Sequence, residues 1–129
     1  MLDTNKLNGK VILMVDDNES NLFVLDALLG HIENITLVEA RNGQEALDKI
    51  RSSENVDLVL LDMMMPVLDG YEFCEILRGD STYGELPVIS ITASAMPGDK
   101  ERCLEVGAND YLSKPYKAEE LIEKITLLL

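Results

Sequence analysis

The 129-residue sequence has little cysteine and no long apolar run. Its two cysteines, Cys74 and Cys103, are too few for a disulfide scaffold and do not form a CxxC pair. We expect both to be reduced thiols in a cytoplasmic protein, because disulfides rarely persist in the cytosol. No apolar run approaches the roughly 18 residues that a spanning helix needs. Residues 1–10 also lack the apolar region of a signal peptide, so we expect no membrane segment.

Positive charge is also scarce, with 11 Lys and Arg against 24 Asp and Glu and a formal net charge of −13. Neutralising phosphates requires clustered Lys and Arg, so direct nucleic-acid binding by this domain is not expected. The same acidity disfavours docking on an anionic membrane surface. The remaining balance, 47% hydrophobic and 27% charged residues, is typical of a folded globular chain. At this length we expect a single domain over residues 1–129.

Short apolar runs alternate with amphipathic segments along the chain. Three runs are rich in β-branched residues and show no polar alternation, which is typical of parallel strands covered on both faces. Five repeats of a strand followed by a helix predict a doubly wound α/β sheet. The strands are expected at 11–15, 35–38, 56–61, 88–91 and 111–112, and the helices at 18–31, 43–50, 71–77, 99–106 and 118–128.

Polar side chains follow four of the five expected strands. Asp16 and Asp17 follow the first strand, Asp62 ends the third, and Thr92 and Lys114 follow the fourth and fifth. Ligands of open α/β sheets bind beyond the carboxyl ends of the strands, and in the order 2-1-3-4-5 the first and third strands are neighbours. The three carboxylates would then lie close together and suit a hard cation, best a partly hydrated Mg²⁺. A carboxylate beside Mg²⁺ and a lysine can attack phosphorus and hold the resulting acyl phosphate.

Each of these residues alone also has a purely structural explanation. Asp17 or Asn18 could simply cap the first helix. Thr92 could be a structural threonine, and a lysine before proline is usually solvated. His31, the single histidine, is expected at the end of the first helix, where a cation meets the helix dipole favourably. The conjunction of the carboxylates with a hydroxyl and an ammonium is more specific than any part of it.

Four segments, 15–18, 61–70, 91–93 and 113–115, together resemble the receiver domain of bacterial two-component response regulators. The resemblance covers the chain from Lys10 to about Leu127, with the motifs in the same order and spacing. It implies a flavodoxin-like fold, in which a five-stranded parallel sheet of order 2-1-3-4-5 is flanked by five helices. It also implies a signalling switch rather than an enzyme.

The resemblance assigns the acidic residues to two roles. Asp62, at the head of a Met-Pro…Asp-Gly loop, looks like the phosphoacceptor. Asp16 and Asp17 look like the pair that holds Mg²⁺ together with Asp62, with the backbone carbonyl of Met64 as a further ligand.

The resemblance also assigns the residues after the fourth and fifth strands. Thr92 looks like the switch hydroxyl, Lys114 like the phosphate-pairing lysine and Tyr111 like the aromatic switch residue. The Lys114-Pro115 bond is expected to be cis. The sequence departs only slightly from the pattern of the family. Leu68 stands where Met is commoner in the family, and Met64 and Ser94 occupy positions that vary within it.

The family resemblance further implies two partner surfaces. A histidine kinase or histidine phosphotransfer protein would dock near the first helix and the loop at Pro115, where Phe23 is expected to lie off the buried stripe. A downstream protein would meet the surface of the fourth helix, fifth strand and fifth helix, with Arg102 and Lys117 among its contacts.

Two alternatives to a signalling switch remain. An aspartyl-nucleophile phosphatase would usually carry a second Asp two residues after the first as general acid, but position 64 is Met. A phosphate-independent interaction module would not need the full set of acidic, hydroxyl and lysine residues that this chain retains. Phosphoryl uptake and turnover with acetyl phosphate and Mg²⁺ would separate the three readings.

Overall fold

The computed structural model describes residues 4–52, 55–65, 68–93 and 98–129. Five parallel strands form one sheet in the order β2-β1-β3-β4-β5, which confirms the predicted class and strand order. The strands are β1 (Val11–Val15), β2 (Thr36–Ala40), β3 (Leu58–Asp62), β4 (Val88–Thr92) and β5 (Asp110–Ser113).

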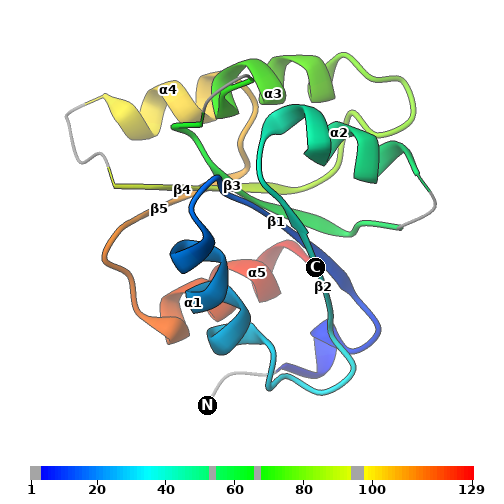
Figure 1. The fold of residues 1–129 in the computed structure, drawn as a ribbon, viewed down its shortest axis with the longest axis vertical. Coiled ribbons are helices and arrows are strands. Elements are labelled where there is room, and N and C mark those ends of the chain that lie inside the picture. Colours follow the sequence, from blue (N-terminus) through cyan, green and yellow to red (C-terminus); the bar gives the residue numbers. More distant parts are fainter. Residues whose placement is uncertain (1–3, 53–54, 66–67, 94–97) are drawn as a thin grey trace.

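Five α-helices cover the two faces of this sheet (Figure 1). One face carries α2 (Gly43–Arg51), α3 (Gly70–Arg78) and α4 (Asp99–Glu105), and the other carries α1 (Glu19–Leu29) and α5 (Ala118–Leu128). A short 3-10 helix, η1 (Thr4–Leu7), precedes the first strand. No helix in the described part of the chain is long and apolar enough to cross a bilayer.

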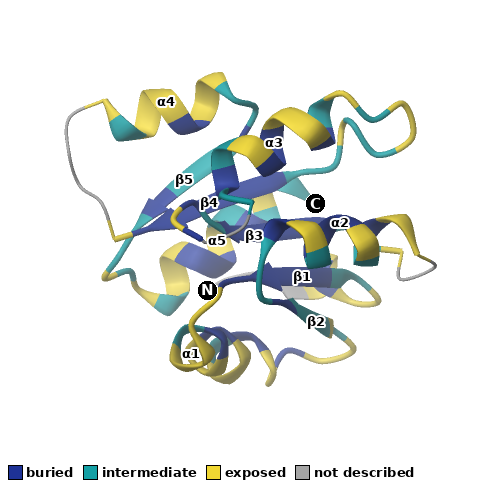
Figure 2. Ribbon diagram, turned by 45° about the horizontal axis from the view of Figure 1, so that its top comes forward, coloured by how far each residue is buried: buried dark blue, intermediate teal, exposed yellow. Residues whose placement is uncertain are grey.

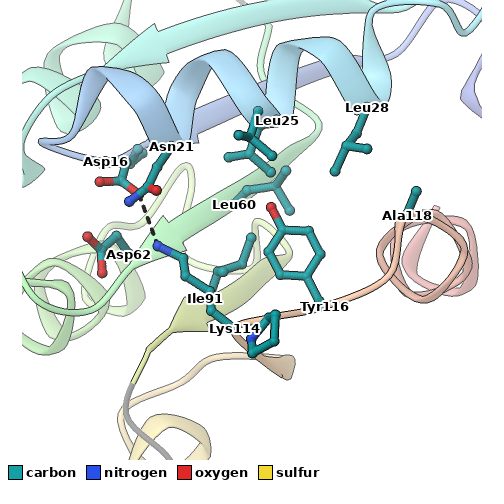
Figure 3. Close-up of a pocket in the computed structure, with 13 residues that line it drawn as sticks. Asp16, Asn21, Leu25, Leu28, Leu60, Asp62, Ile91, Lys114, Tyr116 and Ala118 are labelled. Atoms are coloured by element: carbon teal, nitrogen blue, oxygen red, sulfur yellow. Dashed lines mark ion pairs between the residues drawn. The ribbon is translucent and has the colours of Figure 1, made fainter.

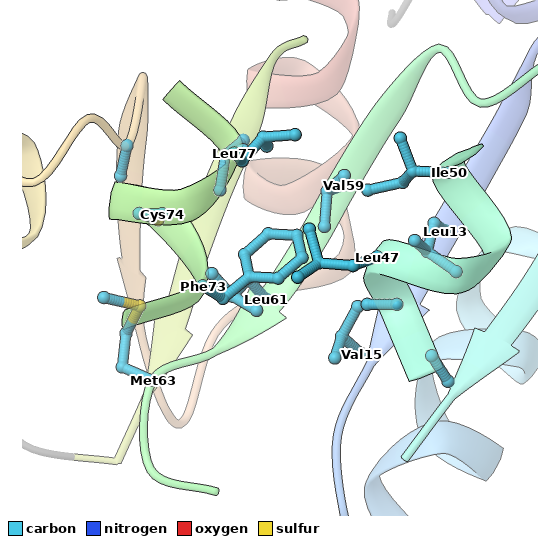
Figure 4. Close-up of a cluster of buried hydrophobic side chains, with 14 of the residues drawn as sticks. Leu13, Val15, Leu47, Ile50, Val59, Leu61, Met63, Phe73, Cys74 and Leu77 are labelled. Atoms are coloured by element: carbon cyan, nitrogen blue, oxygen red, sulfur yellow. The ribbon is translucent and has the colours of Figure 1, made fainter. Parts of the chain in front are cut away.

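The sheet separates two hydrophobic cores, because successive side chains of a strand point to opposite faces. In β1, Leu13 and Val15 pack into the α2–α4 core, whereas Ile12 and Met14 pack into the α1–α5 core. Figure 2 shows the strands as the most buried elements, with the exposed residues on the outer sides of the helices. In the α2–α4 core the ring of Phe73 lies between neighbouring leucine side chains (Figure 4).

Polar side chains fix the starts of three helices. The side chain of Asn18 accepts hydrogen bonds from the backbone at the start of α1, and Asn42 and Asp69 do the same for α2 and α3. The end of α1 differs from the prediction. The helix ends at Leu29, so His31 lies two residues beyond it, because the chain turns there to bring Ile32 into the α1–α5 core.

Arg78, the last residue of α3, connects two loops to the end of this helix through hydrogen bonds. Its guanidinium donates hydrogen bonds to the carbonyls of Gly84 (3.0 Å) and Leu86 (2.7 Å), in the segment before β4. It also donates to the carbonyl of Gly107 (2.9 and 2.6 Å) and to Oδ1 of Asn109 (2.9 Å), between α4 and β5. One side chain therefore holds together the segments that lead into the last two strands.

Candidate functional site

The chain after β1 is folded back by its own side chains. Oδ1 of Asp16 accepts a hydrogen bond from the backbone N–H of Asn18 (2.9 Å). Oδ1 of Asn18 in turn accepts from the N–H groups of Ser20 (2.8 Å) and Asn21 (3.2 Å). Asn18 is therefore the N-cap of α1. Of the two acidic residues before it, Asp16 is buried at the carboxyl end of β1, and the side chain of Asp17 is exposed.

The end of β3 presents Asp62 on a tight loop. Oδ1 of Asp62 accepts a hydrogen bond from the backbone N–H of Met64 (3.1 Å). Gly70, the first residue of α3, donates its N–H to the carbonyl of Met63 (3.1 Å). A Cβ at position 70 would lie 2.6 Å from the Cα of Met63, so only glycine permits this close approach. The loop thereby fixes the direction of the Asp62 carboxylate.

The structure brings the three predicted carboxylates together. One oxygen each from Asp16, Asp17 and Asp62 can be chosen so that all lie within 4.8 Å of one another. The set contains only oxygen donors, which suits a hard divalent cation that keeps part of its water shell. These residues therefore fit Mg²⁺, and binding it would offset the repulsion among three like charges.

Lys114 lies at the same edge, and its nearest carboxylate is that of Asp16. Its Nζ is 3.5 Å from Oδ2 of Asp16, and its backbone N–H donates to the carbonyl of Thr92 (2.9 Å). The Lys114-Pro115 peptide bond is cis, as expected. Sequence spacing placed the lysine in the site, but the pairing with Asp16 became visible only in the structure.

The surroundings of Asp62 disfavour its charged form in the metal-free protein. Burial raises its pKa to about 6, against a lowering by the Met64 N–H. The neighbouring charge of Asp16 raises the pKa further, and the Lys114 ammonium lowers it. A divalent cation at this edge would favour the ionised form, which is the form able to attack phosphorus.

A cavity of about 350 Å³ opens beside these groups, between α1 and α5 (Figure 3). Asp16, Asp62 and Lys114 line its polar end, and Leu25 and the ring of Tyr116 are among its apolar walls.

Asn21 also lines this cavity and was missed by the sequence analysis. The signal was present, since Asn21 precedes Leu25 by four residues and Leu28 by seven, which places all three on one face of α1.

The two proposed switch residues lie on neighbouring strands. Thr92 is the last residue of β4 and is 2% exposed, and Tyr111 is a half-buried residue of β5 that packs against the α2–α4 core. Ser94, singled out in the sequence, lies outside the described residues.

The predicted partner surfaces contain exposed side chains. Phe23 on α1 is 74% exposed, as its position off the buried stripe indicated. Arg102 on α4 stacks over the ring of Tyr71 on α3, 3.9 Å from its centroid, and Lys117 is exposed at the start of α5. The side chain of Met64 points into solvent, at 69% exposed.

Comparisons with known proteins agree with this geometry. The family model of the response regulator receiver domain matches residues 12–126. The chain is 42% identical to the probable transcriptional regulator ycf27 of Cyanophora paradoxa, over 96% of this chain and 50% of that protein. It is 37% identical to the polar-differentiation response regulator DivK of Brucella anthropi, over 90% of this chain and 93% of that protein. The chain thus spans half of the first relative and nearly all of the second.

A solved structure adds a similar fold with a bound metal. The receiver domain of the sensor histidine kinase PA1611 from Pseudomonas aeruginosa matches with a TM-score of 0.80 and 36% identity. The match covers 92% of this chain and 94% of that one. That structure has a magnesium ion coordinated in its active site cleft.

Proposed function

Because this chain belongs to the response regulator receiver domain family, we propose that it is a signalling switch that accepts a phosphoryl group on Asp62. One observation carries the proposal. At the carboxyl ends of the strands, the Asp62 carboxylate lies close to two further carboxylates and to the Lys114 ammonium. A phosphohistidine of a histidine kinase or histidine phosphotransfer protein is the proposed donor.

In the proposed transfer, a carboxylate oxygen of Asp62 forms a new bond to phosphorus. The P–N bond to the donor histidine breaks, and its electron pair leaves with the imidazole. The Met64 N–H, bonded to Oδ1 of Asp62, orients the carboxylate and leaves the other oxygen for the attack. The Lys114 ammonium, 3.5 Å from Asp16, is close enough to the site to pair with an incoming phosphoryl oxygen.

Asp16, Asp17 and Asp62, with the Met64 carbonyl, are the proposed ligands of Mg²⁺. When bound, the ion supplies positive charge that stabilises the phosphoryl oxygens in the transition state. The buried Asp16, fixed by the Asn18 N–H, is the rigid member of the set, and the exposed Asp17 is the adjustable one.

The proposed response begins at Thr92 and Tyr111. A phosphoryl group on Asp62 adds about one to two negative charges and three acceptor oxygens. Lys114 pairs with one oxygen, and the Thr92 hydroxyl turns toward another. The space vacated is filled by the Tyr111 ring, which changes the surface of α4, β5 and α5 that a downstream protein would contact. The change is a shift between two packings, so the phosphoryl group needs only to favour one of them.

The donor surface is proposed around α1 and the loop at Pro115. Both elements border the cavity that reaches Asp62, so a donor histidine there would lie near the acceptor carboxylate. Phe23, exposed on α1, gives this surface an apolar contact of the kind that interfaces bury.

The test is incubation with acetyl phosphate and Mg²⁺, followed by intact and peptide mass spectrometry. We expect one phosphoryl adduct, on Asp62, that requires Mg²⁺ and is absent from Asp62→Asn. Asp26→Asn is the matched control, because Asp26 is an exposed α1 carboxylate that does not line this cavity.

The same experiment separates the alternatives. Continuous release of phosphate well beyond one equivalent would indicate a phosphatase. No adduct in the wild type, with Mg²⁺ present, would indicate an interaction module that works without phosphate. Either result would overturn the proposal.

A further inference from the structure

Ser90, in the middle of β4, has a buried hydroxyl without a partner. The residue is 0% exposed, and its Oγ is the one buried side-chain oxygen or nitrogen in the described part of the chain that has no hydrogen-bond partner. The residues before and after it in β4, Ile89 and Ile91, are apolar and pack into the α1–α5 core on the other face of the sheet. Buried hydroxyls are normally paired, so this exception calls for a physical explanation.

The register of the sheet places Ser90 directly beside Tyr111. Ser90 pairs with Tyr111 of β5 on one side and with Leu61 of β3 on the other. Paired residues of parallel strands share a face, and Leu61, Tyr111 and Val88 of β4 all belong to the α2–α4 core. Ser90 therefore lies on that face, one strand spacing of about 4.8 Å from the backbone of Tyr111.

The Tyr111 hydroxyl is not bonded to Ser90 in this structure, because Oγ of Ser90 has no hydrogen-bond partner. Burial raises the pKa of Tyr111, and Cys103, Asp99 and Glu101 of α4 raise it further. Tyr111 itself is half-buried and packs against the α2–α4 core.

We propose that Ser90 is a positioning residue of the switch, whose hydroxyl bonds to the Tyr111 hydroxyl when the ring leans over β4. This inference rests on the proposed function, since it concerns the conformational change that follows phosphorylation of Asp62. Because Tyr111 pairs with Ser90 in the sheet and a tyrosine side chain is longer than the spacing between strands, a ring that leans across β4 can reach the Ser90 hydroxyl.

Two properties of serine suit this role. Its side chain is small, so it hinders an aromatic ring that leans over β4 less than a branched apolar residue would. Its hydroxyl is unsatisfied in the resting state, and burying an unpaired polar group is unfavourable. The state in which Tyr111 covers Ser90 removes that penalty, and the balance between the two packings shifts toward the inward ring.

The test follows the ring of Tyr111 by aromatic NMR, with and without the phosphoryl mimic beryllofluoride and Mg²⁺. The Tyr111 signals are assigned by comparison with Tyr111→Phe. Ser90→Ala removes the hydroxyl without adding bulk, and Ser90→Val removes it and adds bulk. Ser81→Ala, in an exposed loop, is the matched control.

We expect Ser90→Ala to lower the inward-to-outward ratio of Tyr111 about fivefold in the mimic-bound protein, the effect of losing one hydrogen bond. Ser90→Val should abolish the inward ring. Both variants should still acquire the Asp62 adduct from acetyl phosphate. Ser90→Ala should also raise the urea midpoint of the resting protein, because it removes the unpaired hydroxyl.

A double-mutant cycle distinguishes a direct bond from a general packing effect. Ser90→Ala and Tyr111→Phe should each weaken beryllofluoride binding, and the double variant should be no weaker than either single one. Fully additive losses, or a Tyr111 response in Ser90→Ala equal to that of the wild type, would overturn the inference alone. A wild type that shows no adduct on Asp62 would overturn the proposed function and this inference with it.

Discussion

The guanidinium of Arg78 is the most heavily bonded side-chain group in the described structure, and its removal makes a sharp test of the fold. Arg78→Met keeps the length and the apolar stem of the side chain but removes all five hydrogen bonds. The acceptors left behind are three backbone carbonyls and the side-chain oxygen of Asn109. Asn109 itself accepts from the backbone N–H of Val88, so the start of β4 is affected as well.

The size of the effect follows from these bonds. A hydrogen bond from a charged donor contributes about 1.5–3 kcal/mol, but five bonds to one group are not additive, and water can reach the half-buried carbonyls. We expect a loss of about 3 kcal/mol in the free energy of unfolding. For a domain of this size that corresponds to a fall in Tm of roughly 10 °C. Burial lowers the pKa of Arg78, yet an arginine stays charged across the pH range of the assay, so the loss should not depend on pH.

The assay is urea unfolding followed by circular dichroism, with Arg51→Met as the matched control. Arg51 also ends a helix, α2, but its guanidinium is half exposed and forms one ion pair, Nε to Oδ2 of Asp80 at 3.5 Å. An exposed pair of this kind contributes less than about 1 kcal/mol. The m-value should be the same in both variants, since neither changes the area exposed on unfolding. Equal losses for Arg78→Met and Arg51→Met would refute the view that Arg78 holds the two loops.

Three further predictions concern the acidic site. In Mg²⁺-free buffer, Asp62→Asn should stabilise the fold by about 1 kcal/mol at neutral pH, and urea titrations should show this gain shrinking between about pH 6 and pH 4. Because the pKa of Asp62 is raised to about 6, the folded protein binds a proton on this carboxylate more tightly than the unfolded chain does. Acidification therefore restores the stability of the wild type. A stability gain that does not depend on pH would contradict this reasoning. Asp17→Asn should weaken Mg²⁺ binding in calorimetry and abolish phosphoryl uptake while the circular dichroism spectrum stays unchanged; wild-type binding and uptake would remove Asp17 from the site. Met64→Asn should lose its phosphoryl adduct faster than the wild type, because an apolar side chain at position 64 cannot orient an attacking water; an equal or longer lifetime by mass spectrometry would show that this side chain does not control hydrolysis.

The sequence was sufficient for the features that depend on periodicity and strand order. The apolar runs predicted the parallel sheet. The strand order 2-1-3-4-5, which the family resemblance implied, predicted that Asp16 and Asp62 would lie close together, because it makes β1 and β3 neighbours. The end of α1 was placed too late, at His31, since the stripe that reaches Ile32 continues past the last helical residue.

Features that depend on side-chain reach or loop geometry could not be predicted. The acceptors of Arg78 are mainly backbone carbonyls, and any residue type supplies one, so no pattern in the sequence identifies them. Lys114 could have faced either buried carboxylate, and only the three-dimensional structure shows it nearest to Asp16. The unpaired hydroxyl of Ser90 is a property of everything packed around it, which one residue in an apolar strand does not reveal.

The division of the interior into two cores on opposite sides of the sheet has a consequence for how such a chain can diversify. Side chains of the α1–α5 core and of the α2–α4 core are separated by the backbone of the strands, so substitutions in one core should combine additively with substitutions in the other. Helix α1, which lines the cavity, packs into the α1–α5 core, and Tyr111 packs against the α2–α4 core. If α1 contacts the phosphoryl donor, as proposed, its surface residues can therefore change to fit a new donor without repacking the core around Tyr111. The strands, including the end of β3 that carries Asp62, contribute side chains to both cores and so cannot change independently of either layer.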